Sequence, residues 1–229
     1  MLSVYIGYDP KESVAFYTLA HSIARRSSVP VSIAPVMQSQ LKGIYTRPRG
    51  ATETTEFSLT RFLVPFLTGF RGWSVFMDCD MLCRTDIGAL LSEIDRQKDK
   101  AVLVCKHEYV PKTARKFLGQ AQTKYPRKNW SSFMVFNNER CRVLTPDYVN
   151  TASGLELHRF MWTENRLIGD LPLEWNWLVG EYEYNPRAKF AHYTLGGPYF
   201  DDYRECDYAQ EWFAEFESMR AVATPQRTP

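Results

Sequence analysis

Two carboxylates directly follow a short apolar segment one third of the way along the chain, in the sequence Phe76-Met77-Asp78-Cys79-Asp80. In an extended chain, the side chains of Asp78 and Asp80 lie on one side and that of Cys79 on the other. Two like charges this close repel each other unless a cation or a shared proton compensates them. Mg²⁺ and Mn²⁺ prefer oxygen ligands and often bridge carboxylates to substrate phosphates. The pair therefore predicts a divalent-metal site at the end of a strand, where ligands bind in open α/β sheets.

Two other interpretations of this pair are open. In the first, Asp78 caps a turn and Asp80 caps the following helix, because aspartate readily accepts hydrogen bonds from backbone amides at such positions. In the second, the chain is a phosphatase of the haloacid-dehalogenase type, which also has D-x-D after a strand. That class has its motif on the first strand and Thr or Val two residues after the second aspartate, whereas Leu82 stands there in this chain. The phosphatase interpretation is therefore disfavoured.

The segments around the pair alternate between strand and helix patterns. Apolar runs at residues 4–7, 31–36, 74–77, 101–105 and 133–136 predict buried strands, and a further strand is expected near 190–192. Residues 13–26, 56–68, 87–98 and 209–220 predict helices, and residues 38–55 predict a loop. A chain that begins strand-helix-strand predicts an α/β fold with a mostly parallel sheet flanked by helices. We expect one catalytic domain over residues 1–221 and a frayed tail over 222–229.

The composition excludes several classes of protein. A chain of 229 residues that is 45% hydrophobic and 14% aromatic can bury a large core and is not disordered. No run approaches the roughly 20 apolar residues of a membrane helix, and the start, MLSVYIGYDP, has no basic segment typical of a signal peptide. The net charge of +2 does not predict a general nucleic-acid-binding surface. Five cysteines without a C-x-x-C pair favour reduced thiols and a cytoplasmic protein, peripheral at the inner membrane face if its acceptor is lipid-linked.

An ordered set of motifs extends from residue 3 to about residue 200. The set consists of Ile6-Gly7-Tyr8-Asp9, Thr60-Arg61-Phe62, Met77-Asp78-Cys79-Asp80, Ser131-Ser132-Phe133-Met134-Val135-Phe136-Asn137, Leu171-Pro172-Leu173-Glu174-Trp175-Asn176 and His192-Tyr193-Thr194-Leu195-Gly196-Gly197-Pro198. In this order the motifs resemble the family-8 glycosyltransferases, relatives of glycogenin and of bacterial lipopolysaccharide galactosyltransferases. The resemblance implies a GT-A, Rossmann-like fold. It also implies an enzyme that moves a sugar from a nucleoside-diphosphate sugar, with UDP-sugar favoured, to an acceptor hydroxyl with retention.

The resemblance assigns the metal and catalytic roles to five residues. Asp78, Asp80 and His192 correspond to the ligands of a Mn²⁺ or Mg²⁺ ion that holds the nucleotide diphosphate. Arg61 corresponds to an arginine near the donor sugar and pyrophosphate. Asp78, Asp80, Arg61 and Glu164 form the predicted catalytic set, in which Glu164 stands near the place of the family's absent Asp-Gln-Asp and is a candidate for contacting donor or acceptor.

The nucleotide contacts are assigned in the same way. Gly7, Tyr8 and Asp9 correspond to contacts on the first strand, with the Asp9 carboxylate accepting from a base N–H. Gly196 and Gly197 are expected to let the backbone approach the phosphates.

One departure concerns the diphosphate. The family's Lys-Pro-Trp is replaced by Pro198-Tyr199-Phe200, so Lys189, Arg187 or another cation is expected to take the place of the lysine that pairs with the diphosphate. The chain also lacks the long C-terminal extension of many relatives, which indicates a compact, divergent member.

The acceptor is the least defined part of the prediction. Residues 111–128 carry six cations and no carboxylate, a pattern that fits either a solvated surface or a site for an anionic acceptor such as a phosphorylated lipid, an acidic glycan or a nucleic acid. Two alternative functions are open. A nucleotidyltransferase of similar fold is disfavoured because the first strand has no Gly-rich, basic phosphate loop after it. A non-catalytic sugar- or anion-binding module is disfavoured because Asp78, Asp80, His192 and Arg61 are all present.

Overall fold

The computed structural model describes residues 1–50, 53–108, 111–112 and 126–221. In this part of the chain the main sheet has the strand order β2-β1-β3-β6-β5-β7. These strands are β1 (Leu2–Gly7), β2 (Val31–Val36), β3 (Trp73–Met77), β5 (Val102–Val104), β6 (Phe133–Asn137) and β7 (Ile168–Asp170). All neighbours are parallel except β6, which is antiparallel to both β3 and β5. The predicted α/β fold with a mostly parallel sheet is therefore confirmed.

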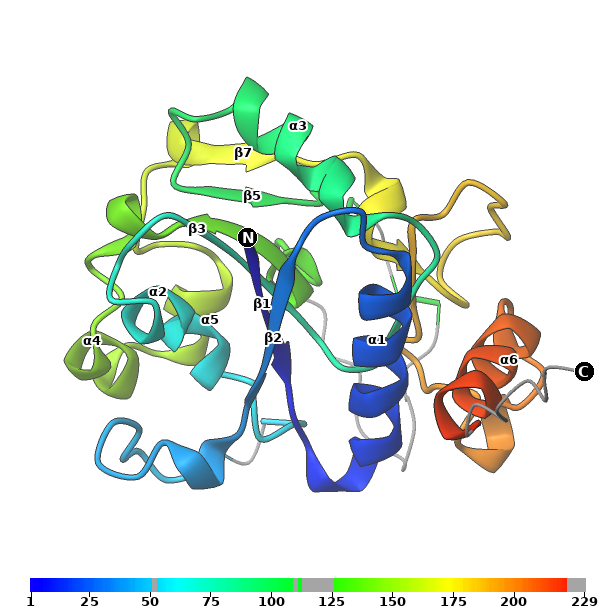
Figure 1. Cartoon of the computed structure of the whole chain (residues 1–229). Helices are drawn as coiled ribbons and strands as arrows, with labels where there is room; N and C mark the ends of the chain where they lie inside the picture. Colours follow the sequence, from blue (N-terminus) through cyan, green and yellow to red (C-terminus); the bar gives the residue numbers. More distant parts are fainter. Residues whose placement is uncertain (51–52, 109–110, 113–125, 222–229) are drawn as a thin grey trace, which may run out of the picture.

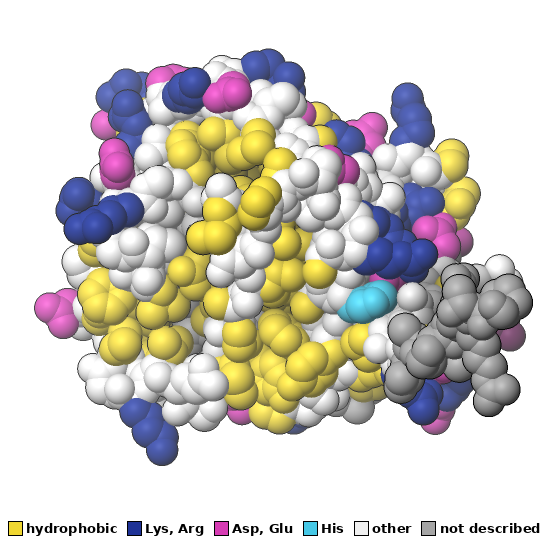
Figure 2. Space-filling view, viewed as in Figure 1, with side chains coloured by type: hydrophobic (Ala, Val, Ile, Leu, Met, Phe, Trp, Pro, Cys, Tyr) yellow, Lys and Arg dark blue, Asp and Glu magenta, His cyan; other side chains and the backbone are white. Residues whose placement is uncertain are grey.

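The strands at the centre of the sheet are apolar because both of their faces are covered. All five residues of β6 are buried, as are four of the five in β3, which is the pattern expected for sheets with helices on both sides. The edge strand β2 is more exposed and contains Pro35, whose missing N–H is tolerated at a sheet edge. Figure 2 views the molecule from the same side as Figure 1. Hydrophobic side chains run along the middle of this side, where β1 and β2 lie, and Lys and Arg are mainly at its periphery.

The helices lie on either side of these strands. Figure 1 shows α1 (Ser13–Arg26) and α6 (Ala209–Arg220) on one side of β1 and β2, and α2 (Val64–Leu67), α4 (Pro146–Thr151) and α5 (Gly154–His158) on the other. Both α1 and α6 have the bounds that the sequence predicts. The predicted helix at 87–98 begins as a 3-10 turn at Ile87–Ala89 and continues as α3 (Leu90–Arg96). None of the helices in the described part has the length and apolar character needed to cross a membrane.

The prediction of one helix over residues 56–68 is wrong. A 3-10 turn at Thr60–Leu63 is followed by the four-residue α2, with Pro65 in its first turn. Proline has no N–H and is accepted only at the start of a helix, so it separates the two short elements. The turn buries Arg61, which is only 6% exposed.

A second small sheet joins distant segments of the chain, in the order β4-β9-β8. The strand β4 (Met81–Cys83) directly follows the two aspartates, and β9 (Phe190–His192) is antiparallel to it with Met81 opposite His192. The two-residue β8 (Trp177–Leu178) pairs with the other edge of β9. Neither β4 nor β8 is predicted from the sequence, because such short strands show no periodicity. This register nevertheless decides where His192 lies.

Candidate metal and nucleotide site

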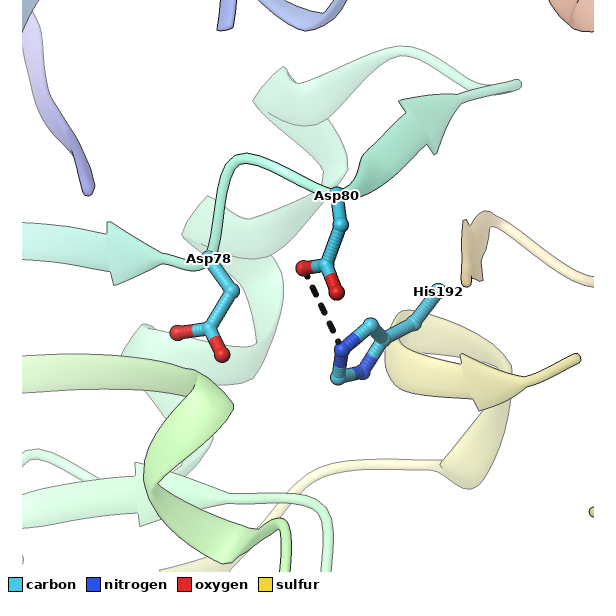
Figure 3. Close-up of side chains that lie close together, drawn as sticks. All are labelled: Asp78, Asp80 and His192. Atoms are coloured by element: carbon cyan, nitrogen blue, oxygen red, sulfur yellow. Dashed lines mark ion pairs between the residues drawn. The ribbon is translucent and has the colours of Figure 1, made fainter. Parts of the chain in front are cut away.

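Asp78, Asp80 and His192 converge on one point at the carboxyl end of β3 in the main sheet. One potential ligand atom from each residue lies within 4.8 Å of the others. Asp78 follows the last residue of β3, Asp80 precedes β4, and His192 ends β9. Figure 3 shows both carboxylates and the imidazole directed toward the same space, with His192 Nε2 3.4 Å from Asp80 Oδ1. Two carboxylates and one imidazole fit the ligand preferences of Mn²⁺.

The orientation of the His192 ring is set by Asn176. The amide nitrogen of Asn176 donates to the carbonyl oxygen of Asn129 at 3.3 Å and to Ser132 Oγ at 2.9 Å. Because a carbonyl oxygen only accepts hydrogen bonds, the other end of the amide, Oδ1, must face His192 Nδ1 at 2.8 Å. Nδ1 therefore donates to Asn176, and Nε2 is the ring nitrogen that faces Asp80. This is the arrangement in which histidines bind metals.

Arg61 compensates the charge of Asp78. Its Nη1 atom lies 2.8 Å from Asp78 Oδ1 and donates to the Ser131 carbonyl oxygen at 2.9 Å, while Nε donates to the Phe57 carbonyl oxygen. The guanidinium also lies over the rings of Phe57 and Phe76, 5.3 and 5.1 Å from their centres. A buried charge needs such partners. The arginine that the sequence assigns to the donor site thus lies beside one of the two aspartates.

Cys79 turns away from the cluster, as the alternation of an extended chain predicts. Its thiol is completely buried in the hydrophobic core. Burial, together with the nearby carboxylates of Glu12, Asp80 and Asp78, raises the pKa of this thiol well above its usual range. Cys79 is therefore a protonated core residue, and its thiol is not one of the proposed metal ligands.

The residues predicted to contact the nucleotide follow β1, whose carboxyl end lies beside that of β3. β1 pairs with β3 so that Ile6 is opposite Met77, which places Gly7–Asp9 next to Asp78. Asp9 is 2% exposed, and its carboxylate accepts hydrogen bonds from the backbone amides of Lys11 at 2.9 Å and Glu56 at 3.1 Å. Asp9 thus joins the first loop to the segment that leads to Arg61. Its contact with a base stays a prediction, as does that of Tyr8, whose ring packs edge-on against Phe16.

The three glycines of the predicted site are covered by aromatic rings. A Cβ atom would lie 2.4 Å from the Phe57 ring at Gly7, 2.5 Å from the Tyr203 ring at Gly196 and 2.1 Å from the Tyr199 ring at Gly197. Gly196 also has a φ of 151°, which favours glycine. These glycines are therefore required by close packing, and an approach to phosphates stays a prediction.

Pro198-Tyr199-Phe200, which stands in place of the family's Lys-Pro-Trp, holds two parts of the chain together and supplies no cation. The hydroxyl of Tyr199 donates to Glu12 Oε1 at 2.7 Å, so this tyrosine anchors the segment to the first turn of the chain. The ammonium of Lys189 lies 4.3 Å from the centre of the Trp175 ring, and Arg187 is exposed. The structure therefore brings neither of these two cations to the aspartates.

Glu164 lies apart from the cluster. Its carboxylate is exposed and forms an ion pair with Arg166, with Nε of Arg166 2.7 Å from Oε2. Arg166 also lowers the pKa of Glu164. Most of the basic stretch, residues 113–125, lies outside the described residues. Sequence reasoning assigned no role to Asn176, although it ends the Leu171–Asn176 motif, and that motif is the signal that could have identified it.

Comparison with known proteins places this geometry in context. No protein-family model matches the chain. The sequence is 45% identical to Protein CDI of Arabidopsis thaliana over 224 residues, which cover 93% of this chain and 85% of that protein.

Among solved structures, the chain is similar to the bifunctional glycosyltransferase WbbM, with a TM-score of 0.66 and 15% identity over 98% of this chain and 50% of that one, so it spans half the length of WbbM. It is also similar to the galactosyltransferase LgtC, solved with donor and acceptor sugar analogues, with a TM-score of 0.61 and 11% identity over 99% of both chains. These similarities show a GT-A glycosyltransferase fold, and the fold that the sequence motifs imply is confirmed.

Proposed function

The chain belongs to the family of the Arabidopsis thaliana Protein CDI, and from its GT-A fold and its Asp78–Asp80–His192 cluster we propose that it is a metal-dependent glycosyltransferase. The proposed donor is a nucleoside-diphosphate sugar, with UDP-sugar favoured, and the proposed acceptor group is a hydroxyl. The name of the relative carries no information about activity. The proposal therefore rests on the fold and on the site.

The observation that supports the proposal most strongly is the orientation of His192. Here Asn176 accepts a hydrogen bond from Nδ1, so Nε2, the nitrogen that can bind a metal, faces Asp80 at 3.4 Å. The ring itself is only 2% exposed, so its position is determined by the fold. An oriented imidazole beside two carboxylates fits a bound cation.

Each residue of the site has a defined task in this proposal. A Mn²⁺ or Mg²⁺ ion held by Asp78, Asp80 and His192 would supply Lewis-acid stabilisation of the departing diphosphate. Arg61 keeps the Asp78 carboxylate in place and lowers the repulsion between the two aspartates. Glu164 remains a candidate for contacting donor or acceptor, because its neighbours Thr163 and Asn165 line a cavity. Retention at the anomeric carbon is implied by the family-8 resemblance.

Calorimetry with UDP and GDP, each with and without Mn²⁺, tests the proposal directly. We expect UDP to bind only in the presence of Mn²⁺, and UDP-sugars to be slowly hydrolysed. Asp80→Asn and His192→Gln are expected to weaken Mn²⁺-dependent binding at least about tenfold, because each removes one ligand. Asp99→Asn is the matched control, since Asp99 is exposed and pairs only with Lys100 among the described residues.

Other outcomes would contradict the proposal in distinguishable ways. Near-wild-type turnover in both Asp78→Ala and Asp80→Ala would show that the aspartates hold no essential metal. Release of pyrophosphate from a nucleoside triphosphate and a sugar phosphate would indicate a nucleotidyltransferase. Nucleotide or sugar binding without any turnover would indicate a binding module.

A further inference from the structure

A cavity of about 350 Å³ lies between the turn at residues 126–129 and the segment that follows α5. Arg127 and Arg159 line it, together with Phe160 and Met161. None of the lining residues in the described part of the chain is an aspartate or a glutamate. A volume of this size is typical of sites for small molecules. Two guanidinium groups without a lining carboxylate make this cavity attractive to an anion.

Arg127 is held in place by neutral partners. Its Nη1 atom donates to the Arg159 carbonyl oxygen at 2.5 Å, and its Nη2 atom donates to Asn165 Oδ1 at 2.6 Å. The guanidinium lies 5.3 Å from the centre of the Trp130 ring. No carboxylate among the described residues forms an ion pair with Arg127. Its position is therefore fixed while its charge stays available to a ligand.

The side chain of Arg159 has a buried donor without an acceptor among the described residues. Its Nε atom is buried and has no hydrogen-bond partner within the described ranges of the chain. Buried donors are nearly always satisfied, so an orphaned guanidinium N–H in a cavity wall indicates a missing acceptor. The backbone of Arg159 is fixed, since its N–H donates to the Leu155 carbonyl oxygen at the end of α5. Nε is closed off from solvent in this structure, so an oxyanion in the cavity would supply the missing acceptor once the guanidinium turns toward it.

One turn connects this cavity to the metal site. The 3-10 turn Trp130–Ser132 accepts hydrogen bonds from Arg61 at the Ser131 carbonyl and from the Asp78 amide at the Ser132 carbonyl. Its Ser131 hydroxyl lies 2.7 Å from Nδ1 of His158, the residue before Arg159. The same short segment therefore contacts Asp78 and Arg61 of the metal site and also His158, the neighbour of Arg159 in the cavity wall.

From these contacts we propose that the cavity binds an oxyanion, a carboxylate or phosphate, carried by the acceptor. The anionic group would pair with the two guanidinium groups, and the exposed side chain of Met161 would contact the body of the molecule. That the ligand is an acceptor rests on the proposed glycosyltransferase function. The anion site itself rests only on the cavity and its arginines.

Calorimetric titration of the metal-free protein with glucose 6-phosphate, glucuronic acid and glucose tests the site. We expect one or both anionic sugars to bind and glucose to show no measurable binding, and the stronger of the two identifies the oxyanion as phosphate or carboxylate. Arg159→Gln should weaken that binding at least about tenfold, because it removes a charged donor. Equal binding of glucose, binding that is unchanged in Arg159→Gln, or no binding of either anionic sugar would overturn the inference.

A pair of surface variants keeps the test valid if Arg159→Gln folds poorly. Met161 lines the cavity and is 65% exposed, while Leu155 on α5 is 52% exposed and lies outside the lining. Met161→Glu places a carboxylate at the cavity and should weaken anion binding at least about tenfold, whereas Leu155→Glu should leave it unchanged. Equal effects of the two substitutions would contradict an anion site at the arginines.

The same samples separate this inference from the proposed function. Mn²⁺-dependent UDP binding should survive in both Met161→Glu and Leu155→Glu. UDP binding without any anion binding would contradict the acceptor site alone. Anion binding without Mn²⁺-dependent UDP binding would support the anion site and contradict the glycosyltransferase proposal.

Discussion

The side-chain oxygen of Asn176 lies 2.8 Å from Nδ1 of His192 and so decides which imidazole nitrogen faces the two aspartates. Both residues are buried, at 0% and 2% exposure. The amide of Asn176 is fixed in turn by Asn129 and Ser132, which belong to the segment before β6. The proposed metal site thus depends on Asn176, which is not itself one of the proposed ligands and lies 16 positions before His192 in the chain.

Asn176→Ala should therefore weaken the binding of Mn²⁺. Without the Oδ1 acceptor, Nδ1 of His192 no longer has a partner that keeps its proton in place and its ring oriented. Loss of such an outer partner typically lowers metal affinity about 10- to 100-fold. Titration followed by Mn²⁺ electron paramagnetic resonance measures the change. Asn185→Ala serves as control, because the side-chain oxygen of Asn185 accepts a hydrogen bond from the Arg187 amide and not from the histidine. Unchanged affinity in a folded Asn176→Ala protein would argue against the role of Asn176.

The free energy of unfolding should fall as the pH decreases below about 6.5. Burial, with a smaller effect of Arg61, lowers the pKa of His158 to about 3, and burial, with a smaller effect of His192, lowers the pKa of His107 to about 3. Both histidines stay neutral in the folded protein while they gain protons in the unfolded chain. Each therefore removes up to about 1.4 kcal/mol of stability per pH unit between about pH 6.5 and 3.

Urea unfolding at pH 7.5, 6.0 and 5.0 measures this dependence. The variant His158→Gln should show a shallower loss of stability with decreasing pH than the wild type, whatever its stability at pH 7.5. Identical slopes for the two proteins would mean that His158 is protonated in the folded state as easily as in the unfolded chain.

Glu215→Gln should destabilise the packing of α6 against α1. The Glu215 carboxylate is 2% exposed and lies 2.5 Å from His21 and 2.6 Å from Arg26, both on α1. Hydrogen bonds to charged groups typically contribute about 1.5–3 kcal/mol. We expect a loss in this range, because the side chains left without a partner, His21 and Arg26, are 29% and 31% exposed and stay partly hydrated. Chemical unfolding and hydrogen exchange in α6 measure the loss.

A matched control lies two residues further along the same helix. Glu217 is exposed and pairs with Arg220, so Glu217→Gln should change the free energy of unfolding by less than about 1 kcal/mol. Equal losses in the two variants would contradict the distinction between the buried and the exposed pair.

Gly197→Ala should destabilise the protein in the absence of any nucleotide. The added Cβ would lie 2.1 Å from the Tyr199 ring, and overpacking of this kind typically costs about 1–3 kcal/mol. Gly154→Ala is the control. Gly154 lies in the first turn of α5, where alanine is favoured, and its added Cβ would make an ordinary contact of 3.7 Å with Leu59. Thermal unfolding of both variants measures the difference. If Gly197→Ala is as stable as the wild type and loses only nucleotide affinity, the glycine serves phosphate approach rather than packing.

The sequence by itself determined the elements whose pattern is repeated over many residues. The apolar run of β1 and β3 and the helical periodicity of α1 are local properties, so they predict the α/β sheet and the end of the strand where Asp78 and Asp80 stand. The spacing of the two aspartates also predicts that Cys79 turns inward. These features depend on the alternation of neighbouring side chains, which the order of residues already contains.

Only the tertiary structure decided which distant residues meet at that strand end. The three-residue pairing of β4 with β9 brings His192 to Asp80, and the break of the predicted 56–68 helix at Pro65 leaves Arg61 in a buried turn beside Asp78. Neither contact has a local signal, because short strands and turns are stabilised by what packs on them rather than by their own propensity. The same reason explains Asn176 and the cavity of Arg127 and Arg159. Their partners come from other segments of the chain, and their roles exist only once those segments are packed together.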